Sequence, residues 1–460
     1  MHRSLSRGMF VSFAVAWVVV MLLHASVSSQ SFSAARDPGV RGGKAGAGGP
    51  IGGLSANERA FFELGLEDFE EAEEVDEGLG PRMNLDGCGG CHSQPAIGGS
   101  SPAVNPQVAF ASKDGGTDKV PSFIKLNGPV REARLVRNPD GTPDGGVAAL
   151  FTITGRPGAD GCRLEQPDFA TELARNNVIF RIPTPVFGAG LIEQIEDTTI
   201  TANLAANSST KRELGIRGRA NVSVSGRTIS GAANRNGNDG TITRFGWKAQ
   251  NVSLLIFAGE AYNVEMGITN ELFQNEREQS PDCYFASVPN DVQNMDAHTA
   301  LTGVTAIQNF ANFQRLLAPP TPSSDTPGGA ASIARGRSAF ESTGCALCHT
   351  PTLRTSETAA VAVLRNKAAN LFSDLLVHDM GVRLADSVSQ GQAGPRDFRT
   401  APLWGLGQRV FFLHDGRTAD LGEAIQAHAS NGSEANGVIS RFNDLRESAK
   451  QDLFNFLRSL

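Results

Sequence analysis

Residues 344–349 have the sequence Gly344-Cys345-Ala346-Leu347-Cys348-His349. Two cysteines three positions apart, followed directly by histidine, are typical of covalent attachment of c-type haem. One short turn presents both sulfurs to the haem vinyl groups, and the histidine then lies under the iron as an axial ligand. The same pattern occurs earlier, as Cys88-Gly89-Gly90-Cys91-His92. A zinc knuckle or a redox-active cysteine pair would explain one such motif, but two copies in one chain predict two covalently bound haem c groups.

Length, composition and charge limit the remaining possibilities. The chain has 460 residues, of which 40% are hydrophobic and 19% charged, as in a soluble globular protein with two or three domains. The formal net charge of -7 argues against a nucleic-acid partner and would suit a small basic cytochrome. The haem motifs use four of the six cysteines. The other two, Cys162 and Cys283, are expected to form a disulfide, with a buried free pair as the alternative.

The first residues resemble an export signal. Arg3 and Arg7 precede an apolar run over residues 9–23, and small residues follow at 25–29. This layout predicts a secretory signal peptide over residues 1–28; a retained anchor is the alternative, although the run is short for a bilayer. No other segment is apolar enough to span a membrane, so we expect no stable span after processing. Haem attachment of this type is a periplasmic process in bacteria, and both signals therefore predict a periplasmic protein.

The composition changes along the chain indicate the domain organisation. Residues 29–53 are rich in glycine and predict a flexible tether. Ser55, with Glu58 three positions later, predicts a capping box that begins a helix. Residues 318–329 are rich in proline, serine and glycine and predict a linker.

The resulting fold prediction is mainly α. It has two cytochrome c-like haem domains, at 54–317 and 330–460, with a loop-rich, short-strand insertion at about 105–240. Short β-favouring runs alternate there with Gly, Pro, Asn and Asp clusters, ending in a strand edge at 228–231 and a loop at 234–240.

Several further motifs are informative together. They are Phe245-Gly246-Trp247-Lys248-Ala249-Gln250, His378-Asp379-Met380-Gly381, Arg399-Thr400-Ala401-Pro402-Leu403-Trp404-Gly405-Leu406, Phe412-Leu413-His414-Asp415-Gly416-Arg417 and Glu423-Ala424-Ile425. With the paired haem motifs they resemble the bacterial di-haem oxidoreductases, a family long catalogued as a domain of unknown function. That family looks like a branch of the di-haem cytochrome c peroxidase and MauG superfamily. The resemblance covers most of residues 54–460. It implies one peroxidatic haem and a second haem that passes electrons to it.

The resemblance also suggests iron ligands. His92 and His349 are the proximal ligands that the haem motifs predict. The superfamily's peroxidases place a distal methionine in a helix after His-Asp-Gly, and the corresponding residue here looks like His428. A bis-histidine second haem would have a lower potential than one with a methionine ligand. Met380 and His378 are the rival ligands.

Two further site residues follow from the resemblance. Glu265-Met266-Gly267 looks like the superfamily's Glu-Met-Gly turn, whose glutamate lies over the peroxidatic iron and would exchange protons with peroxide. On sequence context alone, Glu265 would more often be solvent-exposed. Trp247 is a candidate relay between the haems, or else a core tryptophan. The superfamily's calcium-binding Thr-x-Pro is replaced by Arg409-Val410-Phe411, so calcium is left open.

Three functions remain as hypotheses. The first is a di-haem oxidoreductase with peroxidase-like chemistry, which would take peroxide or another small substrate and electrons from a small donor protein or cytochrome. The second is an electron-transfer cytochrome with both irons six-coordinate. The third is oxidation of a thiol, a protein side chain or an organic substrate on the same scaffold.

Overall fold

Helices supply most of the regular structure, as the sequence predicts. The computed structural model describes residues 34–222, 242–278, 280–285 and 304–460. The α-helices in these residues are α2 (Ala56–Glu70), α3 (Cys88–Cys91), α4 (Gln107–Phe110), α5 (Phe169–Ala174), α6 (Ala189–Glu193), α7 (Asp197–Ala205), α8 (Ser208–Leu214), α9 (Leu254–Met266), α10 (Ala306–Leu316), α11 (Ala330–Thr343), α12 (Gly381–Leu384), α13 (Leu421–Ala427), α14 (Asn436–Asn443) and α15 (Glu447–Ser459). The 3-10 helices are η1 (Lys113–Gly115), η2 (Pro281–Cys283), η3 (Cys345–Leu347), η4 (Ala362–Leu364) and η5 (Leu406–Gln408). The predicted signal peptide, strand edge at 228–231 and loop at 234–240 lie outside the described residues.

The strands are short. They are β1 (Arg82–Met83), β2 (Glu132–Arg137), β3 (Pro143–Ala148), β4 (Phe151–Thr152), β5 (Val178–Arg181), β6 (Asn221–Val222), β7 (Ile242–Thr243), β8 (Leu353–Arg354), β9 (Ala368–Ala369), β10 (Val377–Asp379) and β11 (Asp397–Arg399). Strand β2 is central in an antiparallel sheet of order β3-β2-β5, in which Glu132 is paired with Arg181. Strands β2 to β6 fall within 105–240, where the sequence predicts short strands.

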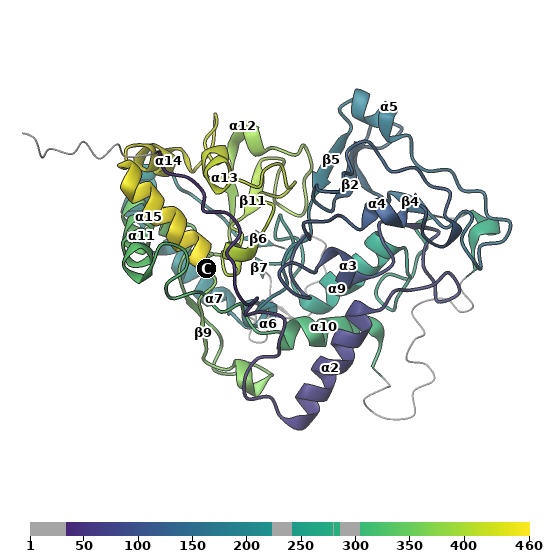
Figure 1. The fold of residues 1–460 in the computed structure, drawn as a ribbon, viewed down its shortest axis with the longest axis horizontal. Coiled ribbons are helices and arrows are strands. Elements are labelled where there is room, and N and C mark those ends of the chain that lie inside the picture. Colours follow the sequence, from purple (N-terminus) through teal and green to yellow (C-terminus); the bar gives the residue numbers. More distant parts are fainter. Residues whose placement is uncertain (1–33, 223–241, 279, 286–303) are drawn as a thin grey trace, which may run out of the picture. The chain divides into compact units, whose positions relative to one another are not determined.

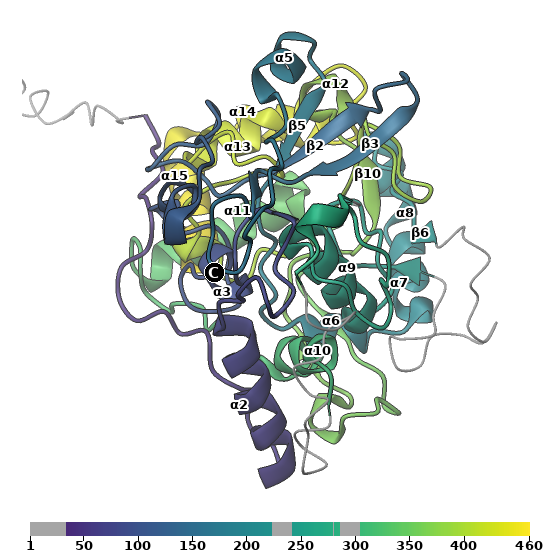
Figure 2. The same ribbon diagram turned by 90° about the vertical axis from the view of Figure 1, so that its right-hand side faces the viewer.

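Helices α2, α9 and α10 surround the first haem motif. The side chain of Ser55 accepts a hydrogen bond from the Glu58 N–H, and the Glu58 carboxylate accepts one from the Ser55 N–H, so the predicted capping box is present. Helix α2 packs on α10 through Phe62 and Phe69, whose ring centroids lie 5.4 and 4.8 Å from that of Phe313. Figure 2 shows α10 beside α2, with α3 at the head of α2. This packing fixes the chain that enters the first haem motif.

Helix α9 ends where its sequence predicts. The Ser253 hydroxyl caps its first turn, and Gly267 ends it with a φ of 81°. A side chain at Gly267 would meet backbone: a Cβ would lie 2.6 Å from the carbonyl oxygens of Gly80 and Arg82. Glycine therefore permits the close approach that places Glu265, two residues earlier, beside the first haem motif.

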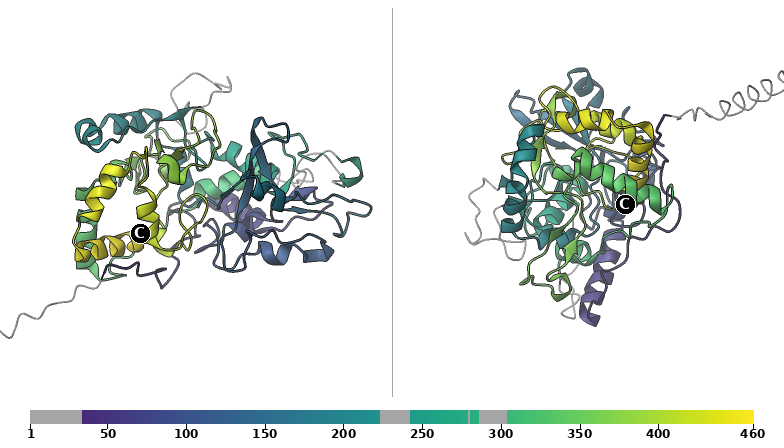
Figure 3. Two further views of the ribbon diagram at one scale, coloured as in Figure 1. Left: turned by 90° about the horizontal axis from the view of Figure 1, so that it is seen from above. Right: turned by 90° about the vertical axis from the view of Figure 1, so that its left-hand side faces the viewer.

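Helices α11, α14 and α15 lie in one part of the molecule (Figure 1), and residues of all three line a cavity together with the second haem motif. Helix α11 packs against α15 so closely that a Cβ on Gly336 would lie 1.9 Å from the carbonyl oxygen of Asp452. Phe340 of α11 contacts Phe456 of α15, with ring centroids 5.4 Å apart. Helix α11 ends at Gly344, which has a φ of 102°, and Cys345 follows at once. Figure 3 shows these helices gathered away from the dark-blue strands of the insertion.

The segment 36–53 differs from the flexible tether predicted from its glycine content. It lies in contact with residues far along the chain. The Arg41 N–H donates to the Gly407 carbonyl at 2.7 Å. Asp37 forms an ion pair with Arg458 of α15 at 2.6 Å, and both side chains are buried. The composition of the segment could not predict these contacts, because the partners lie more than 360 positions away in the sequence.

The proline-rich segment 318–329 lies between α10 and α11 and is hydrogen-bonded to distant parts of the chain, and its role as a linker between domains stays a prediction. The Thr321 N–H donates to the Gly46 carbonyl, and the Ser323 N–H donates to the Ser459 carbonyl. Residues 36–460 form one unit by their contacts, and the division into two cytochrome c-like domains stays a prediction. Among the described helices, none combines the length and apolarity that crossing a bilayer requires.

Candidate haem sites

The first haem motif forms the short helix α3, which begins after Gly87. His92 ends this helix, and its Nδ1 lies 2.9 Å from the Gly99 carbonyl oxygen, which can only accept. Nδ1 therefore carries the ring proton, and Nε2 is left as the free donor atom for a metal. Burial lowers the pKa of His92 to about 4, which keeps the imidazole neutral, as a metal ligand requires.

The second haem motif repeats this arrangement. The His349 Nδ1 lies 3.0 Å from the Phe372 carbonyl oxygen, which again leaves Nε2 free. Burial, and then the charge of a protonated His428, lowers the pKa of His349 to about 4. Two motifs separated by more than 250 positions thus present the same neutral tautomer.

Burial disfavours the thiolate at three of the motif cysteines, Cys88, Cys91 and Cys345. Burial, and then nearby carboxylates, raises the pKa of Cys88 to about 12, and burial raises that of Cys345 to about 12. A redox-active cysteine pair needs a lowered thiol pKa. The raised pKa values of these thiols therefore argue against redox-active cysteine pairs in the two motifs. Cys162 and Cys283, in contrast, form the predicted disulfide.

Each haem motif opens into its own cavity. The first cavity has about 1100 Å³ of empty space, including the part open to solvent, and the second about 1400 Å³. Cys88, Cys91 and His92 line the first, and Cys345, Cys348 and His349 line the second. Each cavity thus combines two thiols for thioether bonds and a neutral imidazole whose Nε2 carries no proton, in a space of the size that takes a cofactor. These donor sets fit haem c.

A second imidazole lines the second cavity. His428 follows directly on α13, whose first turn is capped by the Asp420 side chain. The His428 Nδ1 lies 2.8 Å from the Ala424 carbonyl oxygen, which leaves Nε2 free as in the two proximal histidines. Burial lowers the pKa of His428. Its free Nε2 would suit a ligand, and the ligand role of His428 stays a prediction.

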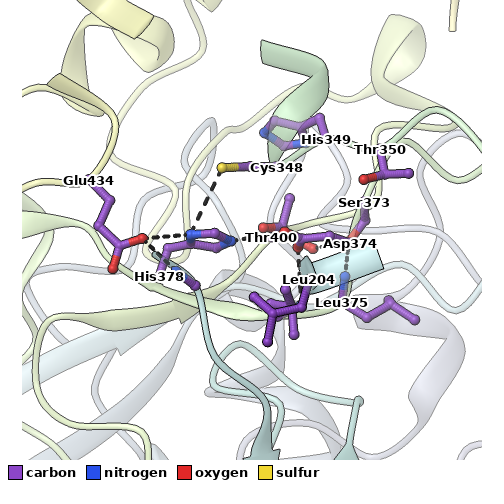
Figure 4. Close-up of polar contacts among 12 residues, drawn as sticks. Leu204, Cys348, His349, Thr350, Ser373, Asp374, Leu375, His378, Thr400 and Glu434 are labelled. Carbon is purple, nitrogen blue, oxygen red and sulfur yellow. Dashed lines mark hydrogen bonds and ion pairs between the residues drawn. The ribbon is translucent and has the colours of Figure 1, made fainter. Parts of the chain in front are cut away.

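His378 is not available as a rival ligand, because both of its ring nitrogens are engaged. Nε2 lies 3.0 Å from an Asp374 carboxylate oxygen, and Nδ1 lies 2.9 Å from one of Glu434 (Figure 4). With a carboxylate oxygen at hydrogen-bond distance from each nitrogen, the ring is held as a double donor and has no lone pair for iron. Met380 lines the same cavity and stays a possible ligand.

Glu265 lines the first cavity and is half-buried, so it is not the solvent-exposed residue of the alternative. Its carboxylate accepts a hydrogen bond of 2.7 Å from the Asn84 side chain. Burial raises the pKa of Glu265 well above its usual value, and the neighbouring charge and hydrogen bond of Glu132 add to the rise. Glu132 also lines this cavity. The structure therefore places a hydrogen-bonded carboxyl pair in the first cavity.

Trp247 lines both cavities, and it is the one residue common to their linings among the described residues. Its indole N–H donates to the Ile182 carbonyl at 2.9 Å. The His414 ring meets it edge-on at 6.4 Å and stacks on Phe398 at 4.3 Å. Burial lowers the pKa of His414 to about 4, so this aromatic group is uncharged at neutral pH.

Sequence reasoning missed Glu132, Asn84 and the stacking of His414. Asn84 precedes the first haem motif by four positions, and His414 belongs to a quoted motif, so both had a local signal. Glu132 begins β2 and reaches Glu265 only through the fold. Among the described residues, the one close group of three metal-ligating side chains is Cys348, Asp374 and His378. It includes a predicted haem-binding cysteine, and calcium stays open.

Comparisons with known proteins agree with the two haem sites. Residues 150–460 match the family described as "di-haem oxidoreductase, putative peroxidase". The first haem motif precedes the matched residues, and its assignment rests on its own geometry. No curated protein matches the sequence.

Three solved structures show weak similarity to the chain. Hydrazine synthase of Kuenenia stuttgartiensis has 16% identity and a TM-score of 0.22, over 40% of this chain and 65% of that one. The di-haem peroxidase BthA of Burkholderia thailandensis has 14% identity and a TM-score of 0.29, over 47% and 65%. A MauG-like protein associated with microbial copper homeostasis has 17% identity and a TM-score of 0.27, over 58% and 89%. The chain spans 65% of the length of the first two. Because the family match covers well over half of its residues, this chain belongs to the di-haem oxidoreductase family.

Proposed function

We propose that this protein is a periplasmic di-haem c-type oxidoreductase that reduces peroxide at the first haem site, with the second passing electrons to it. The observation that carries the proposal is the difference between the cavities. In the second cavity, His428 offers a free Nε2 in addition to that of His349. In the first, His92 is the only histidine in the described lining, and a half-buried carboxyl pair is present instead.

A separate set of residues would hold the cofactor in each cavity. Cys88 and Cys91 would form thioether bonds in the first cavity, with the His92 Nε2 as axial ligand. Cys345 and Cys348 would do so in the second, with the Nε2 atoms of His349 and His428 as ligands. Haem iron, when bound, supplies the coordination position for peroxide and delivers the electrons for its reduction. A six-coordinate second site would be closed to peroxide and would serve electron transfer.

The carboxyl pair supplies the proton chemistry. Reduction of hydrogen peroxide to two water molecules consumes two electrons and two protons. Glu265, hydrogen-bonded to Glu132, would take a proton from the inner peroxide oxygen and return it to the outer oxygen as the O–O bond breaks. Two interacting carboxyl groups hold one proton more readily than two, so the pair offers an acid and a base together. The Asn84 side chain fixes the Glu265 carboxylate in place.

Electrons would reach the first cavity through Trp247, because its indole lines both cavities. They would come from a small electron-donor protein, and the net charge of -7 favours a basic one. The Cys162–Cys283 disulfide supports an oxidising compartment, in accord with the signal-like residues 1–28.

The test is peroxide turnover by Glu265→Gln, supplied with a reduced electron donor. Glutamine keeps the acceptor for Asn84 but cannot exchange a proton. We expect the turnover rate to fall by about 10²- to 10⁴-fold, with both haems attached.

Glu260→Gln is the matched control. Glu260 lies on the same helix, has a pKa raised by burial and is hydrogen-bonded to Asn251, but it does not line the first cavity. Its variant should turn over peroxide at the wild-type rate. Near-normal activity of Glu265→Gln would remove Glu265 from the reaction. A wild-type protein with two low-spin haems in every redox state and no reaction with peroxide would instead indicate an electron carrier.

A further inference from the structure

Two arginines are buried in the wall of the second cavity. Arg399 ends β11, and Arg409 follows η5. Each side chain belongs to a residue that is only 8% exposed, and both line the cavity. The Arg399 N–H donates to the Trp247 carbonyl at 2.8 Å, which fixes this part of the wall to the residue shared by both cavities.

These two guanidinium groups lack compensation by the protein. The Nε of Arg399 and the Nε of Arg409 have no hydrogen-bond partner among the described residues. The Arg399 Nη1 donates to the Arg244 carbonyl, at 3.2 Å. Burial lowers the pKa of each arginine to about 10; the charge of Arg409 adds to this at Arg399, and the charge of Arg458 does so at Arg409. No carboxylate of the described residues counts among the causes that shift either pKa.

The other buried arginines near the cavities have acidic partners. Arg181, in the wall of the first cavity, forms an ion pair of 2.7 Å with Asp386. Among the described residues that line the second cavity, Glu434 is the one acidic residue. Its carboxylate already accepts hydrogen bonds from His378 and from the backbone N–H groups of Arg217 and Gly218. An uncompensated buried charge costs several kcal/mol. Two such charges in the wall of one cavity therefore indicate that the cavity receives an anion.

The anion must fit the site's chemistry. A guanidinium group binds carboxylates and phosphates in a fork of parallel N–H donors. The haem that the donor set of this cavity fits carries two propionate groups. We infer that Arg399 and Arg409 bind the propionates of the second haem, so that its carboxylate edge faces β11 and η5. The inference rests on the proposed occupation of this cavity by haem c.

This placement has a consequence for the second haem's reduction potential. Positive charge beside a haem favours the addition of an electron, and the low dielectric of the interior strengthens the effect. The two arginines would therefore raise the potential, in the direction opposite to a second histidine ligand.

The test is a spectroelectrochemical titration of Arg399→Gln and Arg409→Gln in the purified di-haem protein. We expect each substitution to lower the reduction equilibrium constant of the low-spin haem about tenfold, which is about 59 mV for one electron. The first haem should stay within twofold of wild type. Arg396→Gln is the matched control, because Arg396 lies near β11 but is 47% exposed and paired with Asp379. Its variant should leave both potentials within twofold of wild type.

The charge-conserving variants Arg399→Lys and Arg409→Lys keep the test decisive if a glutamine variant fails to mature. They should keep the low-spin potential within threefold of wild type, and maturation of the lysine variant alone would support a need for positive charge. Wild-type potentials in both glutamine variants, or a tenfold shift in a lysine variant, would overturn the inference. A wild-type protein with one haem per chain by pyridine haemochrome assay would instead overturn the proposed occupation of the second cavity.

Discussion

Lys248 offers a test of how strongly a buried ion pair between distant parts of the chain stabilises the fold. Its side chain is fully buried, and its ammonium group lies 3.0 Å from an Asp386 carboxylate oxygen. It also donates to the carbonyls of Gly394 and Asp397, at 2.9 and 3.0 Å, and lies 4.1 Å from the centre of the Phe398 ring. Lys248→Met keeps the length of the side chain and removes the charge and the donors.

The expected loss of stability depends on the partners that Asp386 keeps after the substitution. Removing one partner of a buried ion pair destabilises by about 3–5 kcal/mol. Asp386 would retain Arg181, at 2.7 Å, and the Val388 N–H, at 3.1 Å. We therefore expect the lower end, about 3 kcal/mol. With an unfolding entropy of ~2.1 cal/mol/K per residue, a loss of about 3 kcal/mol lowers the melting temperature of the unit formed by residues 36–460 by about 3 °C.

The assay is thermal unfolding followed by far-UV circular dichroism, at one scan rate for all variants. Lys450→Met is the matched control. Lys450 also pairs with a carboxylate, that of Glu447 at 2.8 Å, and lies 5.8 Å from the centre of the Phe442 ring, but near the surface. Such a pair contributes about 0–1 kcal/mol. A melting temperature for Lys248→Met no lower than that of Lys450→Met would refute the reasoning.

Two further predictions concern the second cavity. His428→Ala should convert one haem from low spin to high spin in ferric optical and EPR spectra, and an unchanged spectrum would exclude His428 as a ligand. Burial opposes ionisation of Glu434, but its hydrogen bond with His378, then the charge of His378, outweighs this and lowers the pKa of Glu434 to about 2. A folded-state pKa below the unfolded value of 4.5 contributes stability above pH 4.5 that is lost as pH falls toward 2, about 3 kcal/mol in all. In acid unfolding the advantage of wild type over Glu434→Gln should therefore shrink across that window, and a constant difference would contradict it.

Local rules allowed much of this structure to be predicted from the sequence. The capping box of Ser55 and Glu58 begins α2, and the glycine after Met266 ends α9, because cap and turn residues act on their immediate neighbours. The haem motifs are equally local, since the chemistry requires two sulfurs and a histidine within one turn. The disulfide could be predicted by elimination, because only Cys162 and Cys283 remained unassigned.

The contacts that the sequence did not predict join residues that lie far apart in the chain. Glu132 joins Glu265 across more than 130 positions, and no pattern around either residue indicates the pairing. His378 was a plausible iron ligand until the fold supplied Asp374 and Glu434 on both of its nitrogens. The glycine-rich residues 36–53 are held by partners far along the chain, because Arg41 donates to the Gly407 carbonyl and Asp37 pairs with the Arg458 guanidinium.

The shared position of Trp247 also bears on the timing of electron transfer. Trp247 belongs to the lining of both cavities, and both cavities lie within one unit of the chain. An electron passing from one cavity to the other would cross this shared residue, without waiting for two bodies to meet. Its rate should follow driving force and temperature, while glycerol or sucrose, which slow large motions through viscous drag, should leave it unchanged.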